Sequence, residues 1–119
     1  MNGSTVNSDP TIETRSPHSG AVVVSLGGEH DLASADELEQ TLGRCLDAYP
    51  HLIVDLSGAG YIDSSTIGVL LRANRRAEDE GHAFNLVLGT APIVERILEV
   101  TGVLATLHTV ATVEQALGA

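Results

Sequence analysis

Two kinds of hydrophobic pattern alternate along this chain. Short runs of Val, Leu and Ile are typical of strands buried on both faces, and apolar residues that recur every three or four positions are typical of amphipathic helices. The apolar runs predict strands at 21–29, 51–58, 83–89 and 104–110. A less apolar run at 11–16 predicts a short strand at the edge of the sheet.

The first predicted helix follows the first apolar strand. Residues 34–37, SADE, have the form of a capping box in which Ser34 is the N-cap and Glu37 reaches back to it. Apolar residues at helical spacing follow, and they place Cys45 on the inner stripe, where it is most simply a small buried hydrophobe. Pro50 is expected to close the element.

Three more helices are predicted farther along the chain. The second has an apolar stripe that starts at Ile67, and it is expected to end near Gly81. The third should begin at Pro92, because a missing N–H costs nothing at the first helical position, and should stop just before Gly102. Residues 112–119 predict a terminal helix.

The order of these elements predicts the fold class. Strands that alternate with helices of about 10 to 15 residues indicate βαβ units, so we predict an α/β fold with a mostly parallel central sheet of about five strands and about four helices. The first strand is expected at an edge, where it can pair antiparallel. Residues 1–10 are small and polar and are predicted to be a disordered leader, and residues 11–119 are predicted to form one domain.

Charge and composition narrow the function. The formal net charge is −10, from 16 acidic residues and six basic residues that are all Arg. Such a surface repels phosphate backbones, so direct binding of nucleic acid is not expected. The chain has a single cysteine, no pattern of a signal peptide and no apolar segment of about 20 residues. We therefore expect a cytoplasmic protein that is not inserted in a membrane.

The sequence carries no pattern of an enzyme. GAG at residues 58–60 follows a strand, but Asp63 stands where a third glycine would be, so we interpret it as a mobile turn. Neither Ser64 nor Ser65 lies on the glycine-flanked elbow that a serine hydrolase needs. The histidines lack the spacing of metal ligands and are expected to be solvated turn residues. No catalytic residue, metal or cofactor is therefore predicted. The histidines are His18, His30, His51, His82 and His108.

The segment YIDSSTIG draws attention because four polar residues stand together at a predicted helix start. Asp and Ser are favoured N-caps worth about 1 kcal/mol, but one residue satisfies that need. If Asp63 or Ser64 is the cap, Ser65 falls in the first helical turn with its hydroxyl outward. A phosphate there would meet free N–H groups and the helix dipole, yet it would add about −1.5 to −2 charges to an acidic rim. The pattern therefore indicates a phosphorylation switch at Ser65.

The outer face of the same predicted helix has two interpretations. Its arginines could simply keep the helix soluble, supported by ion pairs such as Arg75–Asp79 and Arg76–Glu80. They could also dock a partner, because arginine is common among interface anchors. The residues assigned to this face are Gly68, Val69, Arg72, Arg75 and Arg76.

The order of these motifs resembles that of the STAS domains of bacterial anti-sigma factor antagonists. The similarity extends over GGEHDLASADEL, LIVDLSGAGYIDSSTIGVLL, VERILEVTGV and TVEQAL, from about Thr11 to Leu117. Its most specific parts are the D-S-S segment with Gly68 behind it and the V-x-R-x-L-x-x-x-G helix from Val94 to Gly102. A STAS-like fold is what this resemblance implies.

The resemblance also implies a function. Ser65 would be phosphorylated by a partner that is both anti-sigma factor and serine kinase, with ATP as the substrate of that partner. The unphosphorylated chain would bind the partner and free a sigma factor in a stress response, the phosphorylated chain would let go, and a phosphatase would reset it. The chain is expected to be a monomer or weak dimer. Thr66 stands where many relatives have glycine and is a second candidate acceptor.

Other residues match positions near the phosphosite. Asp31 corresponds to an acidic position of the family, and Asp63 and Ser64 match the approach to the acceptor serine. Taken with the outer helix face, the expected partner-binding residues are Asp31, Asp63, Ser64, Thr66, Gly68, Val69, Arg72, Arg75 and Arg76.

Two rival functions remain open on the sequence alone. A STAS subunit of a transporter or of a stress-sensing scaffold complex would use the same helix face to dock a different partner. An enzyme or nucleotide-binding domain is disfavoured, because no phosphate loop or catalytic set is visible.

Overall fold

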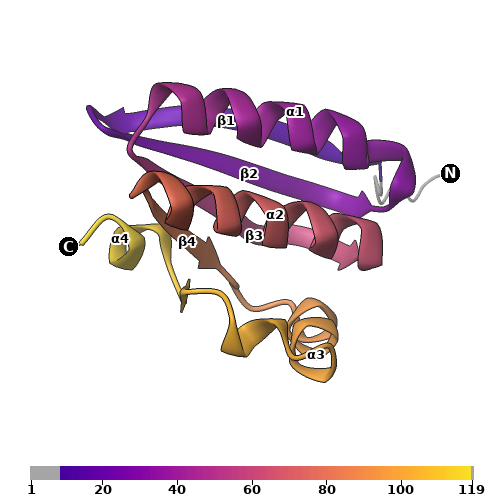
Figure 1. Cartoon of the computed structure of the whole chain (residues 1–119). Coiled ribbons are helices and arrows are strands. Elements are labelled where there is room, and N and C mark those ends of the chain that lie inside the picture. Colours follow the sequence, from indigo (N-terminus) through magenta and orange to yellow (C-terminus); the bar gives the residue numbers. More distant parts are fainter. Residues whose placement is uncertain (1–8, 119) are drawn as a thin grey trace, which may run out of the picture.

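The computed structural model describes residues 9–118, so most of the leader predicted at 1–10 lies outside the described residues. Within them, strands and helices alternate, and the predicted α/β class is confirmed (Figure 1). The strands are β1 (Thr11–His18), β2 (Ala21–His30), β3 (His51–Ile62), β4 (Ala83–Val87) and β5 (Thr109–Val110). The helices are α1 (Leu32–Ala48), α2 (Ser64–Glu80), α3 (Pro92–Val100) and α4 (Val113–Ala116), with a 3-10 turn η1 (Val103–Ala105).

The five strands form one sheet in the order β1-β2-β3-β4-β5. β1 pairs with β2 antiparallel at one edge, and every other pair is parallel, as predicted. β2 and β3 form the longest pairing, which runs from Ala21 opposite His51 to His30 opposite Ile62. Consequently β2 and β3 end side by side, and the helices that follow them also begin side by side.

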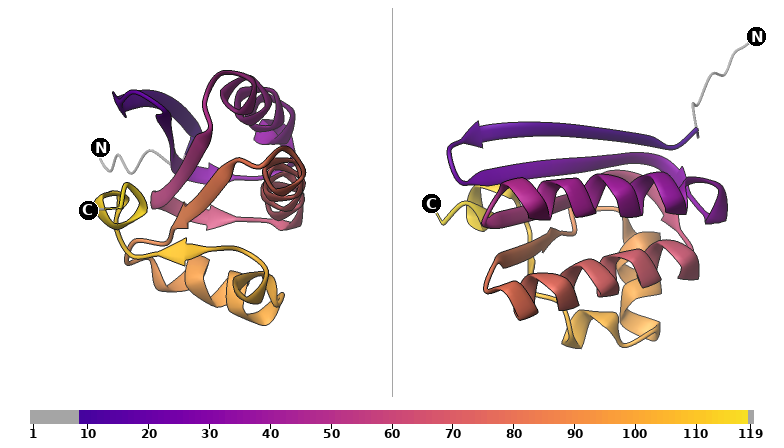
Figure 2. Two further views of the ribbon diagram at one scale, coloured as in Figure 1. Left: turned by 60° about the vertical axis from the view of Figure 1, so that its left-hand side comes forward. Right: turned by 45° about the horizontal axis from the view of Figure 1, so that its top comes forward.

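Helices cover both faces of the sheet, but unequally (Figure 2). The helices α1, α2 and α3 pack on one face over a large apolar cluster that includes Leu38, Leu70 and Leu98. Cys45 belongs to this cluster and is 7% exposed, as the helical spacing predicted. The short α4 covers the other face, where Ala116 packs over the middle strands. Its partners in that smaller cluster are Val23, Ile53 and Val87.

The helix ends predicted from Pro and Gly are confirmed. Pro92 lies at the first position of α3, and Gly81 ends α2 with a φ of 74°. Gly102 follows α3 with a φ of 76°, a conformation that other residues rarely adopt. The predicted strand at 104–110 is mostly absent, because the 3-10 turn takes its start and only Thr109–Val110 pair with β4.

The GAG segment is not a mobile turn, and that prediction is wrong. Residues 58–60 lie inside β3: Gly60 falls at a shift in register, Ala59 pairs with Gly28 of β2, and Gly58 faces Gly27. The register of the two strands shifts on both sides of this pair. A Cβ atom on Gly58 would lie 3.2 Å from the Leu26 carbonyl oxygen, so glycine allows the two backbones to approach closely at the irregularity.

The capping box predicted at residues 34–37 is also wrong. Asp31 is the N-cap of α1, with extended backbone and a side chain that accepts a hydrogen bond from the Ala33 N–H. Ser34 instead lies buried within the first turn of the helix. The cause is the length of β2: it continues to His30 and leaves one residue before the helix.

Candidate functional site

Two aspartates are the N-caps of neighbouring helices, at the carboxyl ends of β2 and β3. Asp31 follows His30 and Asp63 follows Ile62, and these two preceding residues are paired across β2 and β3. Asp63 accepts hydrogen bonds from the N–H groups of Ser65 and Thr66, at 3.0 Å and 3.1 Å. The Asp63 N–H in turn donates to the His30 carbonyl at 3.1 Å. The cap of α2 is thus tied to the end of β2.

Ser65 is oriented by the same carboxylate. Its hydroxyl donates to Asp63 Oδ1 at 2.6 Å, a short charge-assisted hydrogen bond. Ser65 is half-buried, whereas Ser64 beside it is exposed. The hydroxyl predicted to point outward is therefore held back against the capping carboxylate, so any reaction at its oxygen also disturbs the cap.

The pKa of Asp63 is lowered from its ordinary value. Burial acts in the opposite direction, but the hydrogen bonds from the Ser65 hydroxyl and from the N–H groups of Thr66 and Ser65 outweigh it. The carboxylate is therefore fully ionised at neutral pH. An ionised carboxylate is the stronger acceptor, which holds the Ser65 hydroxyl in a single orientation.

Replacing Asp63 with alanine is expected to destabilise the fold by about 1 kcal/mol through loss of the N-cap. Asn caps equally well without ionising, so Asp63→Asn isolates the contribution of the charge. The pKa of Asp63 is lower in the folded chain than in the unfolded chain. Its charge therefore stabilises the fold above the unfolded pKa of about 3.9, and this contribution is lost as pH falls through the folded pKa.

Urea unfolding of wild type and Asp63→Asn at a series of pH values between neutral and acid measures that contribution. The difference in unfolding free energy should be largest near neutral pH and should shrink as the pH is lowered. A difference that is the same at every pH would show that the charge of Asp63 has no part in it.

Thr66 does not fit the roles predicted for it. Its side chain is completely buried, with 0% exposure, so it can neither accept phosphate nor contact a partner in this conformation. Its hydroxyl lies near the Asp63 carboxylate and helps to lower the pKa of that group, but it makes no hydrogen bond of normal geometry among the described residues. An unpaired buried hydroxyl costs about 1–3 kcal/mol. The prediction of Thr66 as an alternative acceptor is therefore corrected.

Thr66→Val is expected to raise the free energy of unfolding by about 1 kcal/mol, because valine keeps the shape and removes the unpaired hydroxyl. Thr41→Val is the matched control. Thr41 is also buried in a helix, at 7% exposure, but its hydroxyl donates to the Glu37 carbonyl at 2.8 Å. This control should be destabilised in the same denaturant titration. Equal destabilisation of both variants would contradict the assignment of the Thr66 hydroxyl as unpaired.

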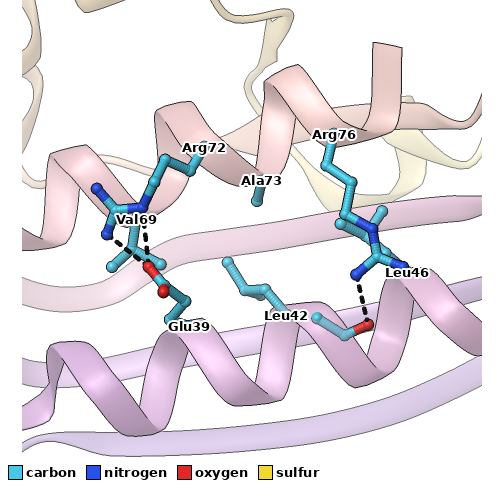
Figure 3. Close-up of a pocket in the computed structure, with 8 residues that line it drawn as sticks. Glu39, Leu42, Leu46, Val69, Arg72, Ala73 and Arg76 are labelled. Carbon is cyan, nitrogen blue, oxygen red and sulfur yellow. Dashed lines mark hydrogen bonds and ion pairs between the residues drawn. The ribbon is translucent and has the colours of Figure 1, made fainter. Parts of the chain in front are cut away.

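The face of α2 assigned to docking is largely turned toward α1. Val69 is only 2% exposed and lines a cavity of about 160 Å³ between the two helices (Figure 3). Arg72 Nε donates to Glu39 Oε1 of α1 at 2.9 Å. The spacing had placed Val69 and Arg72 on an outer face, and the cause of the error is that α2 has α1 as a second neighbour besides the sheet.

Arg76 is bound in the same way at the other end of that cavity. It forms ion pairs with Asp47 of α1 and with Glu80, the second of which the sequence predicted. It also donates to the Gly43 carbonyl at 3.1 Å (Figure 3). Arg72 and Arg76 therefore connect α2 to α1, and the Arg72 side chain remains 64% exposed in its ion pair.

Two other residues of the assigned face form no hydrogen bond or ion pair with α1 within the described part of the chain. Arg75 is exposed and takes part in no ion pair within residues 9–118, so the pair predicted with Asp79 is not formed. Gly68 is half-buried, and a Cβ atom there would lie 3.2 Å from an Arg72 guanidinium nitrogen. Glycine at this position leaves room for Arg72 to reach α1.

Sequence reasoning missed apolar side chains that are exposed beside the two caps. Leu32, directly after Asp31, is 76% exposed, and Tyr61, two residues before Asp63, is 39% exposed. Single exposed apolar residues are common on protein surfaces, so these two add apolar area near the caps without by themselves defining an interface. The only signal in the sequence was that both residues are close to the two aspartates. Helical or strand periodicity takes no account of that position.

The described residues contain no group of three or more His, Cys, Asp or Glu side chains that could hold a metal ion. Among residues 9–118, no helix has both the length and the apolar character needed to cross a bilayer.

An antiparallel edge strand, a parallel sheet behind it and an Asp-capped α2 with Ser65 in its first turn together define a STAS-like α/β domain. The chain belongs to the STAS domain family, which matches residues 10–116.

Named relatives of this family are similar to the chain. The anti-sigma-F factor antagonist RsfB of Mycobacterium tuberculosis is 32% identical over 69 residues, which are 57% of this chain and 57% of that protein. The match therefore spans less than two thirds of that relative. The crystal structure of an anti-sigma factor antagonist from Mycobacterium paratuberculosis has a TM-score of 0.83 and 29% identity, over 96% of each chain.

A more distant structure shares the fold. Bacillus SpoIIAA in its phosphorylated form has a TM-score of 0.68 and 19% identity, over 91% of this chain and 97% of that chain.

Proposed function

We propose that this chain is an anti-sigma factor antagonist without catalytic activity of its own. In its unphosphorylated form it binds an anti-sigma factor that is also a serine kinase, and so frees a sigma factor. Phosphorylation of Ser65 by that partner switches the chain off, and a phosphatase restores it. The observation that carries this proposal is the Ser65 hydroxyl at the start of α2, held at 2.6 Å by the Asp63 carboxylate.

The geometry suits Ser65 as a phosphate acceptor. Its oxygen attacks the terminal phosphorus of the ATP held by the kinase; the new bond joins Oγ to phosphorus, and ADP leaves. The Ser65 proton is already directed at Asp63 Oδ1, which is the nearest base. Phosphoryl transfer depends mainly on positioning, and the Asp63 hydrogen bond supplies it by fixing the nucleophilic oxygen.

The added phosphate would also explain release. It places about −1.5 to −2 charges beside the ionised Asp63 and removes the hydroxyl proton that this carboxylate accepts. The Ser65 and Thr66 N–H groups are already bound to Asp63, but the positive end of the α2 dipole can stabilise the new charge, so the fold survives. During transfer the nucleotide phosphates of the kinase must lie against Ser65. The phosphorylated product therefore faces like charges across the same interface.

The surface around Ser65 offers both charge and apolar area to a partner. Asp31 and Ser64 are exposed there, and Leu32 and Tyr61 flank them. We propose that partner contacts centre on this edge and include Asp63. Gly68 and Arg75 extend the contact along α2. Buried Thr66 and Val69 lie outside it.

Displacement of a sigma factor tests the function. The purified chain is titrated into a complex of the cognate anti-sigma factor with its fluorescently labelled sigma factor, and release is followed by anisotropy. Without ATP, the chain should release the sigma factor in proportion to its concentration. With ATP, release should decay as Ser65 is modified. A chain that never displaces the sigma factor, even in excess and without ATP, would contradict the proposal.

A further inference from the structure

His30 is a buried polar residue at the junction of four elements. The sequence indicated a solvated turn residue, and that prediction is wrong, because His30 is 0% exposed at the end of β2. Its Nε2 lies 3.0 Å from the Gly27 carbonyl and 3.2 Å from the Thr11 carbonyl of β1. Its Nδ1 lies 3.0 Å from the Ser34 hydroxyl in the first turn of α1. The imidazole thus connects β1, β2 and α1.

These partners determine where the imidazole carries its proton. A carbonyl oxygen can only accept a hydrogen bond, so Nε2 must carry a hydrogen that is shared between Gly27 and Thr11. None of the ion pairs within the described residues includes His30, and an unpaired buried charge is costly. The ring is therefore neutral and Nδ1 is an acceptor. The Ser34 hydroxyl also lies 3.2 Å from the Asp31 carbonyl, but it has a single hydrogen, which the neutral ring accepts at Nδ1, at 3.0 Å.

The fourth element reaches His30 through the main chain. The His30 carbonyl accepts the hydrogen bond from the Asp63 N–H at 3.1 Å, and Asp63 caps α2 and holds Ser65. Asp31, the cap of α1, is the next residue in the chain. The His30 side chain is buried and held by three partners, and the two capping aspartates are attached to the same residue. Asp31 follows it in the chain, and Asp63 is bound to its carbonyl.

We propose that His30 is a positioning residue for the Ser65 site: its neutral imidazole fixes the end of β2, and through its carbonyl it sets the place of the Asp63 cap. The inference rests on the proposed function for the importance of Ser65. The positioning role of His30 can be tested on the chain alone, without a partner protein. It can therefore be disproved while the proposed function holds, and the proposed function can be disproved while the positioning role holds.

Leucine at this position would fill the space but supply no hydrogen bond. The Gly27 and Thr11 carbonyls would lose their donor, and the Ser34 hydroxyl would keep only the Asp31 carbonyl as an acceptor, so the end of β2 should loosen. Glutamine can return part of the arrangement, since its side-chain amide places a donor near the position of Nε2.

The experiment combines two NMR measurements on the full chain. In the wild type, the nitrogen shifts of the His30 ring report the tautomer, and Nε2–H is expected. The acid titration of the Asp63 carboxyl carbon is then compared between wild type and variants. In His30→Leu, the Asp63 midpoint should move up toward the ordinary value of about 3.9, because its hydrogen-bonded position is relaxed. In His30→Gln, it should stay nearer to that of the wild type.

Leu46→Ala is the control for loss of stability alone. Leu46 is 1% exposed in the large apolar cluster under α1, α2 and α3. It lies near the C-terminal end of α1, away from Asp63. Its substitution should destabilise the fold and leave the Asp63 midpoint unchanged. An Nδ1–H tautomer in the wild type would overturn the proposal, even if His30→Leu did not fold. An unmoved Asp63 midpoint in folded His30→Leu, or an equal shift in Leu46→Ala, would also overturn it.

Discussion

Ser65→Ala is expected to abolish phosphate transfer to this chain by its cognate kinase, whereas Ser64→Ala should accept phosphate at close to the wild-type rate. Only the Ser65 oxygen is held by the Asp63 carboxylate, at 2.6 Å, and stands at the start of α2. Ser64 is exposed beside it and makes no corresponding contact among the described residues. Phosphopeptide mapping after incubation with the kinase and ATP measures the outcome.

The comparison with Ser64→Ala separates loss of the acceptor from loss of docking, because both variants remove one hydroxyl from the same surface. Thr66→Val provides a third test. It should also be phosphorylated normally, because the Thr66 side chain is fully buried. If Ser65→Ala incorporated phosphate at the wild-type yield, the acceptor would have to be another residue.

Ser65→Asp is expected to weaken binding of the anti-sigma factor by about tenfold or more while leaving the fold intact. A second carboxylate would face the nucleotide phosphates that the kinase holds against this site, and like charges juxtaposed across an interface cost several kcal/mol, where about 1.4 kcal/mol is a factor of ten. The effect should diminish at high salt, since exposed charges are screened. Titration calorimetry at two salt concentrations measures both the affinity and its salt dependence.

Ser65→Asn is the matched control for this substitution. Asparagine has nearly the same size as aspartate and carries no charge, so it should bind much more tightly than Ser65→Asp. Equal weakening by both variants would assign the effect to shape and would refute the electrostatic account of release.

Most of the fold could be predicted because its signals are local. The ends of α2 and α3 were marked by Gly81, Pro92 and Gly102, which act through their own backbone preferences. The start of α1 was mistaken for a different reason. Asp31 and Ser34 are both good N-caps, and only the pairing of β2 with β3 up to His30 decides between them.

The glycines at 58–60 show the limit of the same reasoning. Glycine favours a turn when it is judged alone, but in β3 it serves the close approach of two strands. That role depends on Gly27 and Leu26, some thirty positions earlier in the chain, and no local pattern reports it.

The candidate site divides along similar lines. Asp63 and Ser65 are neighbours in sequence, so their cap and hydroxyl contact could be expected from residue types alone. The orientation of Val69 and Arg72 could not be predicted, because helical periodicity identifies a single buried face. The helix α2 has two such faces, one against the sheet and one against α1. His30 was missed for a related reason: its partner Thr11 is 19 residues away, on a strand that folds back beside it.

The most direct test of the account compares the chain with and without phosphate on Ser65. The chain is phosphorylated to completion by its kinase, purified, and titrated beside the unmodified chain against the anti-sigma factor. Tight binding of the unmodified chain and loss of measurable binding for the phosphorylated chain, restored by phosphatase treatment, are the predicted result. Equal affinity of the two forms would contradict the claim that Ser65 is a switch.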